Sequence, residues 1–236
     1  MRCFHCCCLF PVNFGDKQIL KNISFELPEK AIIGLVAPNG TGKTTMMKAI
    51  LGQVSRFSGE ITLNGEDYTS LKKKSRLLEN VSLLPDQSEL FEEFTGIEHL
   101  ELYKSIWKSS KKVETIIALL QMEDYAKNRV ATYSLGMRQR LCFAMQVIGD
   151  TSYMFMDEVM NGLDPTNVLL VSTILQQLAA EGKAIMVSSH ILYNLEEISQ
   201  QILFLKDGVM FEYNDPKKSL MEKYQEIYVK GQFSIN

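Results

Sequence analysis

Residues 37–44 constrain the possible fold more than any other part of the chain. They read Ala-Pro-Asn-Gly-Thr-Gly-Lys-Thr and lie between Ala31–Val36, a nearly all-apolar run, and Lys43–Leu51, which has helical character. Such an apolar run is typical of a strand buried on both faces of a mainly parallel sheet. A strand, a tight glycine-containing loop and a helix in this order direct backbone N–H groups and a helix N-terminus toward one point, where phosphate oxygens bind. We therefore predict a phosphate-binding loop at residues 37–44.

Two side chains of this loop carry the predicted chemistry. Lys43 reaches the terminal phosphates, and the Thr44 hydroxyl binds Mg²⁺, which bridges phosphate oxygens. Ala37 stands where the motif has its first glycine, a departure that the looser form of the motif admits. The alternative, an ordinary glycine-containing turn, explains the flanking strand and helix less well.

A second apolar strand, Tyr153–Met156, ends in two adjacent acids. Asp157 would lie beside the phosphate loop and bind Mg²⁺ through water, and Glu158 would polarise the attacking water as general base. Adjacent acids at a strand end are also common surface features, so this segment alone favours neither interpretation. The phosphate loop upstream favours the functional one.

A third segment lies between these two. Ser134 and Gly136 precede an apolar, helix-prone run. A serine cap with exposed backbone N–H groups at a helix start is a second anion site. The alternative is an ordinary helix cap, and the segment in isolation favours that alternative.

Composition narrows the remaining classes of protein. The 236 residues include 25 Lys and Arg against 28 Asp and Glu, a formal net charge of −3, so a global basic field for nucleic acid is absent. The most apolar stretch, Leu141–Met156, is too short to span a bilayer and contains Asp150. Four of the five cysteines lie within the first eight residues, unlike a secreted disulfide framework. We expect a cytoplasmic protein.

The order of the predicted elements gives the fold class. Beside the strands already named, Ile23–Leu27 alternates as an antiparallel strand does, and Ala184–Ser188 and Gln201–Leu205 are strand-like. Between about residues 87 and 149 the pattern is helical. We predict an α/β protein with a mainly parallel core sheet, an antiparallel β edge and a helical subdomain inserted at about 87–149, within one domain spanning residues 1–236.

Local signals add three elements to this outline. Apolar residues at helical spacing predict helices at Gly96–Trp107 and Lys112–Met122. The dipeptide Asn64-Gly65, after a strand-like run, is a hairpin signal.

Taken together, these segments resemble the ATP-binding cassette family of transport ATPases, from about Val12 to Glu222. Tyr133–Met137 resembles the family's signature loop in the variant form seen in many bacterial exporters. Ser134 and Gly136 match that loop, whereas the residues beside Gly136 depart from its commonest form. The resemblance implies the phosphate-loop NTPase fold of the ABC ATPases.

The resemblance also assigns roles to single residues. Phe14 resembles the aromatic residue that stacks on adenine, and Asp164 belongs to a Gly-Leu-Asp-Pro segment similar to the D-loop that links two nucleotide sites. His190 resembles the switch histidine that contacts the γ-phosphate, although a lone histidine at a strand end is usually structural. The resemblance implies that Glu158, His190 and Lys43 are catalytic. The residues that it assigns to nucleotide binding are Phe14, Ala37, Pro38, Asn39, Gly40, Thr41, Gly42, Lys43, Thr44, Thr45, Asp86, Gln87, Ser134, Gly136 and Asp164.

The weakest match is the segment similar to the family's Q-loop. Asp86 takes the position that normally holds glutamine, and Gln87 follows it. An acid here is able to coordinate Mg²⁺ or its water, so the expected metal ligands are Thr44, Asp157 and Asp86. The negative charge of an acid at this position is, however, repelled by a triphosphate. Val159 replaces the usual proline after the general base, a change that we expect to be tolerated.

The resemblance fails at the first ten residues, where the family has a strand of alternating apolar and polar residues. This chain has Cys3-Phe4-His5-Cys6-Cys7-Cys8 instead. Cysteine is a small hydrophobe that packs in such a strand. A start that is not native and a thiol and histidine metal site are the alternatives, and the latter lacks the two-knuckle spacing of zinc sites.

For partners, the resemblance implies ATP and Mg²⁺, a second copy or a sister cassette that completes each site, and a separate permease on the helical lobe near residues 86–110. The chain would then be peripheral on the inner face of the membrane, and the signature variant favours an exporter of drugs, peptides or similar compounds. The alternatives are a soluble cassette ATPase acting on nucleic acid or ribosomes, a non-hydrolytic half of a heterodimer, and a small-molecule kinase. The charge of −3 and the lack of heptads disfavour the first, so no nucleic acid is expected.

Overall fold

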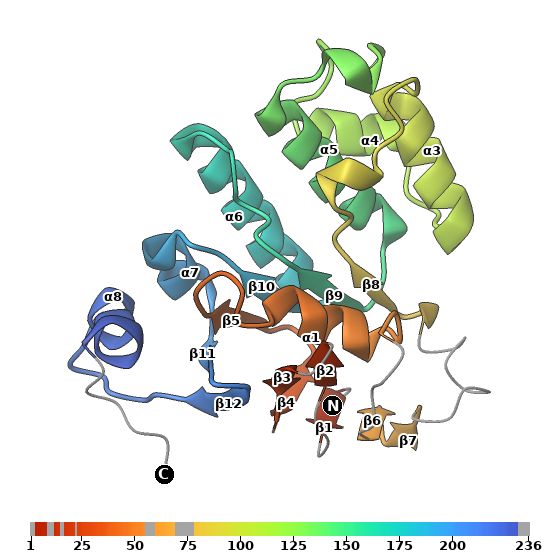
Figure 1. Ribbon diagram of the computed structural model, residues 1–236. Coiled ribbons are helices and arrows are strands. Elements are labelled where there is room, and N and C mark those ends of the chain that lie inside the picture. The colour runs from red at the N-terminus through yellow and green to blue at the C-terminus, as the bar shows by residue number, and fades with distance from the viewer. Residues whose placement is uncertain are drawn as a thin grey trace.

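The computed structural model describes residues 3–8, 12–14, 17–21, 23–54, 60–68 and 78–230. A mainly parallel sheet crosses the middle of the molecule (Figure 1). Helices α3, α4 and α5 gather on one side of it, and a smaller antiparallel sheet lies on the other side, near the N-terminus. Apart from Phe14, the predicted site residues lie on the central sheet, on its flanking helices or on the segments that join them.

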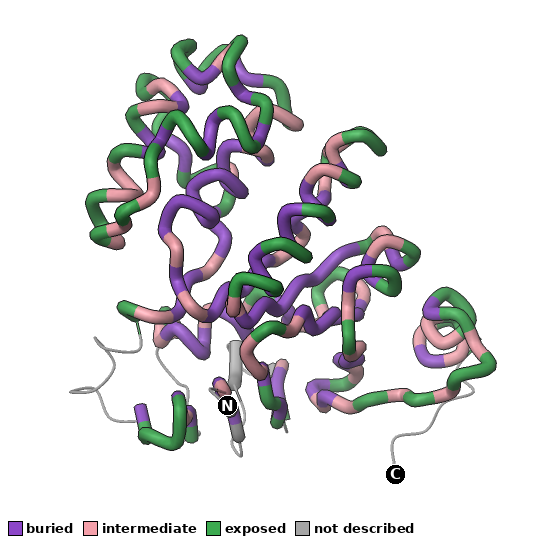
Figure 2. Tube along the Cα trace, turned by 180° about the vertical axis from the view of Figure 1, so that it is seen from behind, coloured by how far each residue is buried: buried purple, intermediate pink, exposed green. Residues whose placement is uncertain are grey.

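The central sheet has six strands in the order β12-β11-β5-β10-β9-β8. All neighbours are parallel except β12, which pairs antiparallel with β11. Every residue of β5, β9 and β10 is buried, which confirms the prediction from their apolar runs (Figure 2). The strands are β5 (Ile32–Val36), β8 (Val81–Leu83), β9 (Tyr153–Met156), β10 (Ala184–Ser188), β11 (Gln201–Lys206) and β12 (Val209–Glu212).

A four-stranded antiparallel sheet has the order β4-β1-β6-β7. In β4 (Ile23–Pro28) buried and exposed residues alternate as predicted. The predicted hairpin joins β6 (Glu60–Leu63) to β7 (Glu66–Asp67), and both turn residues have positive φ, 55° at Asn64 and 81° at Gly65, as a tight hairpin requires. The remaining strands are β1 (Cys3–Cys8) in this sheet, and β2 (Val12–Phe14) and β3 (Lys17–Leu20), which pair with each other.

The cysteine-rich start forms strand β1 between β4 and β6. Phe4 and Cys6 are completely buried, and the Phe4 ring lies 5.5 Å from that of Phe155 in β9. Cys6 therefore packs as a small hydrophobe, which was the first of the interpretations of this segment. Among the described residues no cluster of three or more His, Cys, Asp and Glu side chains is placed to hold a metal ion. The side chains of His5, Cys7 and Cys8 lie outside the described set.

Between β8 and β9 the described elements are all helical. Helix α3 has the predicted bounds Gly96–Trp107. Helix α4 (Val113–Leu119) is shorter than predicted, because the chain turns at Gln121, which has φ +52°. A Cβ at Gly149 would lie 3.0 Å from the Trp107 ring, so glycine there lets α5 approach α3. The other elements are η1 (Gln87–Glu89), η2 (Val130–Thr132) and α5 (Leu135–Gly149).

The remaining helices follow the phosphate loop or the later strands. Gly34 of β5 leaves room for α7, because a Cβ there would lie 2.9 Å from the Leu195 side chain. Near the C-terminus, the Tyr228 hydroxyl lies 2.9 Å from the Val36 carbonyl oxygen at the end of β5. Within the described residues, no helix has the length and apolar character needed to cross a membrane. These helices are α1 (Lys43–Ile50), α6 (Pro165–Ala180), α7 (Leu192–Ile198), α8 (Leu220–Tyr224) and the π-helix η3 (Gln225–Val229).

Candidate functional site

The predicted phosphate loop joins β5 to α1. Gly40 (φ +77°) and Gly42 (φ +106°) have left-handed backbone, which residues with a side chain rarely adopt. A Cβ at Gly42 would also lie 2.6 Å from a methyl carbon of Ile19. Glycine at position 42 is therefore required by both backbone conformation and space. The Thr41 hydroxyl donates a hydrogen bond of 2.7 Å to the Pro38 carbonyl and closes the loop.

The Lys43 ammonium group is buried within this loop. Its Nζ donates hydrogen bonds to the carbonyl oxygens of Ala37, at 2.9 Å, and Pro38, at 3.3 Å. It also lies 3.6 Å from Glu158 Oε1. Carbonyl and carboxylate oxygens thus surround this charge at the position where phosphate oxygens are predicted to bind.

Three hydroxyl and carboxylate groups meet where β5, β9 and β10 end. Thr44 Oγ1 donates a hydrogen bond to Asp157 Oδ2, and Ser188 Oγ donates one to Asp157 Oδ1. Ser188 Oγ also accepts a hydrogen bond of 2.8 Å from the Glu158 backbone N–H. A hydroxyl in contact with a carboxylate offers the hard oxygen ligands that Mg²⁺ prefers, so this donor set fits that ion.

The Glu158 carboxylate has partners on both oxygens. His190 Nε2 lies 2.6 Å from Oε1 and 3.0 Å from Asn39 Oδ1, and Asn161 Nδ2 donates a hydrogen bond to Oε2. Glu158 itself has φ +50°, an uncommon conformation for a residue with a side chain. The two predicted catalytic groups, Glu158 and His190, are therefore in direct contact.

Sequence reasoning missed three polar residues that contact the predicted acids. These are Gln139, Asn161 and Ser188. Ser188 stands at the end of an apolar strand, the same signal that singled out Asp157. Gln139 is one of two glutamines, with Gln146, among the otherwise apolar buried residues of helix α5. Either signal marks a buried polar group, but neither identifies its partner.

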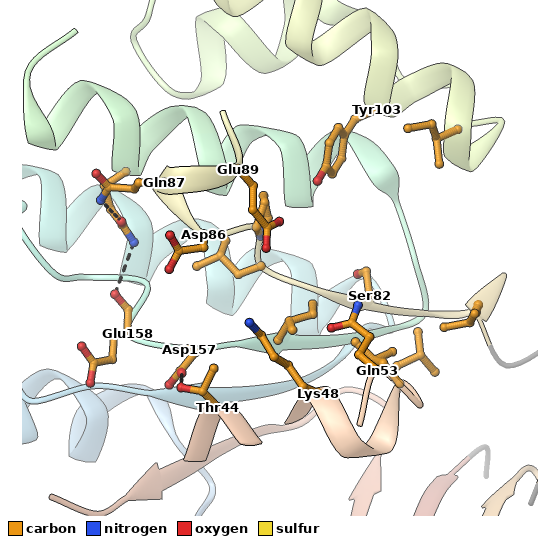
Figure 3. A pocket seen from close by; sticks show the side chains of 18 of the residues that line it. Thr44, Lys48, Gln53, Ser82, Asp86, Gln87, Glu89, Tyr103, Asp157 and Glu158 are labelled. Atoms are coloured by element: carbon orange, nitrogen blue, oxygen red, sulfur yellow. Dashed lines mark hydrogen bonds between the residues drawn. The ribbon is translucent and has the colours of Figure 1, made fainter. Parts of the chain in front are cut away.

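A cavity of about 550 Å³ lies between the sheet and the helices of the 87–149 region. Its walls include Thr44, Asp157 and Glu158 from the sheet side, and Asp86 and Gln87 from the segment after β8 (Figure 3). The structure therefore brings together five of the predicted site residues, which come from three separate parts of the chain.

Asp86 and Gln87 have different partners. Asp86 caps η1: its Oδ1 accepts hydrogen bonds from the backbone N–H and the hydroxyl of Ser88, at 2.8 and 2.6 Å. These bonds hold the pKa of the Asp86 carboxyl below its usual range. Gln87 Nε2 instead donates a hydrogen bond of 2.5 Å to Gln139 Oε1 (Figure 3).

The signature and D-loop residues are not among those lining the cavity. Ser134 caps α5 by accepting a hydrogen bond of 3.3 Å from the Met137 N–H. Asp164 caps α6 by accepting one of 3.1 Å from the Asn167 N–H. Gly136 approaches the D-loop, since a Cβ there would lie 3.3 Å from the Gly162 carbonyl oxygen. The cap considered for Ser134 is therefore present, Asp164 is a cap that the sequence pattern did not predict, and neither residue lines the cavity.

The two other predicted nucleotide contacts are Thr45 and Phe14. Thr45 is in the first turn of α1. Phe14 ends strand β2, and its side chain lies outside the described residues, so its predicted stacking on adenine stays a prediction.

Comparisons with known proteins identify the family of this chain. The family model described as "ABC transporter" matches residues 20–161. The chain is 31% identical to the lantibiotic transport ATP-binding protein SrtF of Streptococcus pyogenes, over 83% of this chain and 84% of that protein. It is 32% identical to the uncharacterised ABC transporter ATP-binding protein YdbJ of Bacillus subtilis and 31% identical to the Nod factor export ATP-binding protein I of Rhizobium meliloti. Those two alignments include 83% and 89% of this chain but only 64% of each relative. The chain therefore spans a little less than two thirds of the length of these relatives.

Solved structures share the same fold. One described as the ATP-binding subunit of an ABC transporter superposes with a TM-score of 0.83 at 22% identity, covering 95% of this chain and 98% of the other. A nucleotide-free ATP-binding cassette gives a TM-score of 0.78 at 16% identity, covering 97% and 99%. The predicted fold class is thereby confirmed. The family match over residues 20–161 and the likeness to SrtF over most of both chains mean that this chain belongs to the ATP-binding proteins of the ABC transporter family.

Proposed function

We propose that this chain hydrolyses ATP and that the reaction drives a separate permease. The observation that carries the proposal is the contact between Glu158 and His190, 2.6 Å, at the edge of the phosphate loop. A carboxylate held this way accepts a proton from an attacking water, and a histidine beside it orients that water and contacts the terminal phosphate.

Lys43, Thr44 and Asp157 supply the electrostatic part of this mechanism. The Lys43 ammonium exchanges its contacts with the loop carbonyls for phosphate oxygens, which bear more negative charge. Thr44 and Asp157 would hold Mg²⁺, which offsets charge on the phosphates. The exposed Asp86 carboxylate lines the same cavity and is the third proposed ligand, directly or through water.

The site is completed by a second cassette. Ser134 and Gly136 stand at the start of α5, apart from the cavity of their own chain. We expect them, with Asp164, to face the phosphates bound by a second copy or a sister cassette, where the N-terminus of α5 attracts anions. The single domain of residues 1–236, with its helical subdomain at about 87–149, is the unit that pairs.

Export is the proposed direction of transport. The relatives SrtF and Nod factor export protein I are, by their names, ATP-binding proteins of lantibiotic transport and of Nod factor export. The permease is proposed to dock on the helical face near residues 86–110, where Phe91 and Ile106 are exposed. In that arrangement the chain lies on the cytoplasmic face of the membrane and its transported substrate is selected by the permease.

The first experiment replaces the general base. We expect Glu158→Gln to slow ATP turnover by about 10² to 10⁴-fold, as loss of a general base does. Glu123→Gln, at an exposed position of the helical region, is the matched control and leaves turnover unchanged. An unaltered rate in Glu158→Gln would contradict the assignment.

The same variant tests the composite site. Without hydrolysis, Glu158→Gln is expected to form a dimer with Mg-ATP and to remain a monomer without it, as measured by size-exclusion chromatography. If the variant binds ATP but stays a monomer in the presence of Mg-ATP, this chain does not pair with itself.

A further inference from the structure

We propose that Gln87 and Gln139 form an amide relay that sets the position of the general base Glu158 from the segment after β8. Both act as positioning residues, since neither contacts the Glu158 carboxylate. The relay deepens the proposed hydrolytic function and rests on it for its effect on turnover.

The central member of the relay is Gln139 on helix α5, which is only 5% exposed. Its Nε2 donates hydrogen bonds to the carbonyl oxygens of Glu158, at 3.2 Å, and Val159, at 2.9 Å. Its Oε1 accepts the 2.5 Å hydrogen bond from Gln87 Nε2, and Figure 3 marks the hydrogen bonds between Gln87 and Glu158 with dashed lines. An amide has one accepting and one donating end, so this orientation is the only one that satisfies all three contacts.

At one end, the relay holds a strained residue. Glu158 has φ +50°, which persists only where its surroundings over-determine the conformation. Its backbone N–H is held by Ser188 and its carbonyl by Gln139, so side chains from two different elements fix this residue on both sides. The carboxylate carried by this backbone contacts His190, so a shift of the backbone would disturb that contact.

At the other end, the relay begins in η1, directly after the position where the family has its glutamine. Asp86, which takes that position, is not the residue that bonds to Gln139: its Oδ1 accepts hydrogen bonds from Ser88 instead. Gln87 is the side chain of this segment that bonds to Gln139, and both residues line the cavity wall. A displacement of η1 therefore pulls on Gln139 and, through it, on the peptide groups beside Glu158.

The test removes each amide while keeping side-chain length. We expect Gln139→Met and Gln87→Met each to lower kcat by about 10-fold, because the base is misplaced, and to leave the KM for ATP within about 2-fold. The double variant should be no slower than Gln139→Met alone, since both changes break one chain of contacts.

Gln146→Met is the matched control. Gln146 is a second buried glutamine of α5, two turns further along, and its Nε2 donates a hydrogen bond of 2.8 Å to Ser82 Oγ instead. This change should lower stability in the same way but leave kcat unaltered. If all three variants lose kcat equally at equal folded fraction, or if Gln139→Met keeps the wild-type kcat, the relay is wrong.

A second readout needs no turnover. His190 touches Glu158, so its ring resonance in the NMR spectrum without nucleotide, assigned with His190→Gln, should shift in Gln139→Met and stay in place in Gln146→Met. If the wild-type protein has no ATPase activity but the His190 resonance shifts in Gln139→Met, the proposed hydrolysis is refuted and the relay is supported. If the wild-type protein is active but the His190 resonance does not shift in Gln139→Met, only the relay is refuted.

Discussion

Ser188 connects both acids of the site. Its hydroxyl donates a hydrogen bond to Asp157 and accepts one from the Glu158 N–H, and it is completely buried. Ser188→Ala leaves that N–H without its acceptor, which costs about 1–3 kcal/mol of unfolding free energy. We also expect kcat to fall by about 10-fold, because the two acids lose their common anchor. Chemical denaturation and steady-state turnover measure the two effects.

Ser82→Ala provides the comparison for this prediction. Ser82 is also buried in the central sheet, and its hydroxyl contacts Thr151 and Gln146 rather than either acid. It should lose similar stability without loss of kcat. Equal losses of kcat in both serine variants would mean that Ser188 acts only through folding.

Site residues that belong to short motifs are predictable from the sequence, whereas residues such as Ser188, which contact them, are not. Lys43, Asp157, Glu158 and His190 follow from short patterns, because each stands at the end of an apolar run or in a glycine-containing loop. The partners of those residues do not. Ser188 lies 30 positions from Glu158 in the chain, so only the packing of β9 beside β10 makes them neighbours.

Helix α3 begins with a capping box, whose contribution to stability a single substitution can measure. The Thr95 hydroxyl accepts a hydrogen bond from the Glu98 N–H, and the Glu98 carboxylate accepts one from the Thr95 N–H. Thr95→Ala should therefore lower the free energy of unfolding by about 1 kcal/mol. Thr173→Ala is the control with the opposite expectation: it lies exposed inside α6, where alanine is the better helix former. Urea denaturation of both variants checks the sign, and an equal loss would contradict a capping role.

Elements were predictable where one local signal decides them. The apolar runs gave β5, β9 and β10, and the helical spacing gave α3 with its observed bounds. The end of α4 was not predictable in this way, because the pattern continues to Met122 while the backbone turns at Gln121. Met122 is buried by packing in the core rather than by helical periodicity.

Topology belongs to the whole molecule, and only part of it is readable from the sequence. Alternating strands and helices predict a mainly parallel sheet. The order β12-β11-β5-β10-β9-β8 places the first of these strands, β5, between β11 and β10, which come far later in the chain. This interleaving brings the phosphate loop beside Asp157 and Ser188, and it depends on long-range contacts that no window of sequence contains.

Buried hydroxyls distributed over the molecule predict a loss of stability at high pH. Burial raises the pKa of Tyr103 to about 12 and that of Tyr133 to about 12. In the unfolded chain a tyrosine titrates near pH 10. Because the folded-state pKa is the higher one, the protonated form is favoured by folding, so stability is fully present below about pH 10 and is lost as the pH rises toward 12.

The variant Tyr103→Phe isolates this effect from the titration of lysines, which lose their charge over the same range. The urea midpoint of the wild-type protein should fall between pH 8 and pH 11, and that of Tyr103→Phe should fall by less, since it retains the partly buried ring without the ionisable hydroxyl. Parallel denaturation curves at the two pH values measure the difference. Identical pH dependence in the two proteins would mean that Tyr103 ionises as readily in the folded chain as in the unfolded one, and that the space between the sheet and the helices of the 87–149 region admits water.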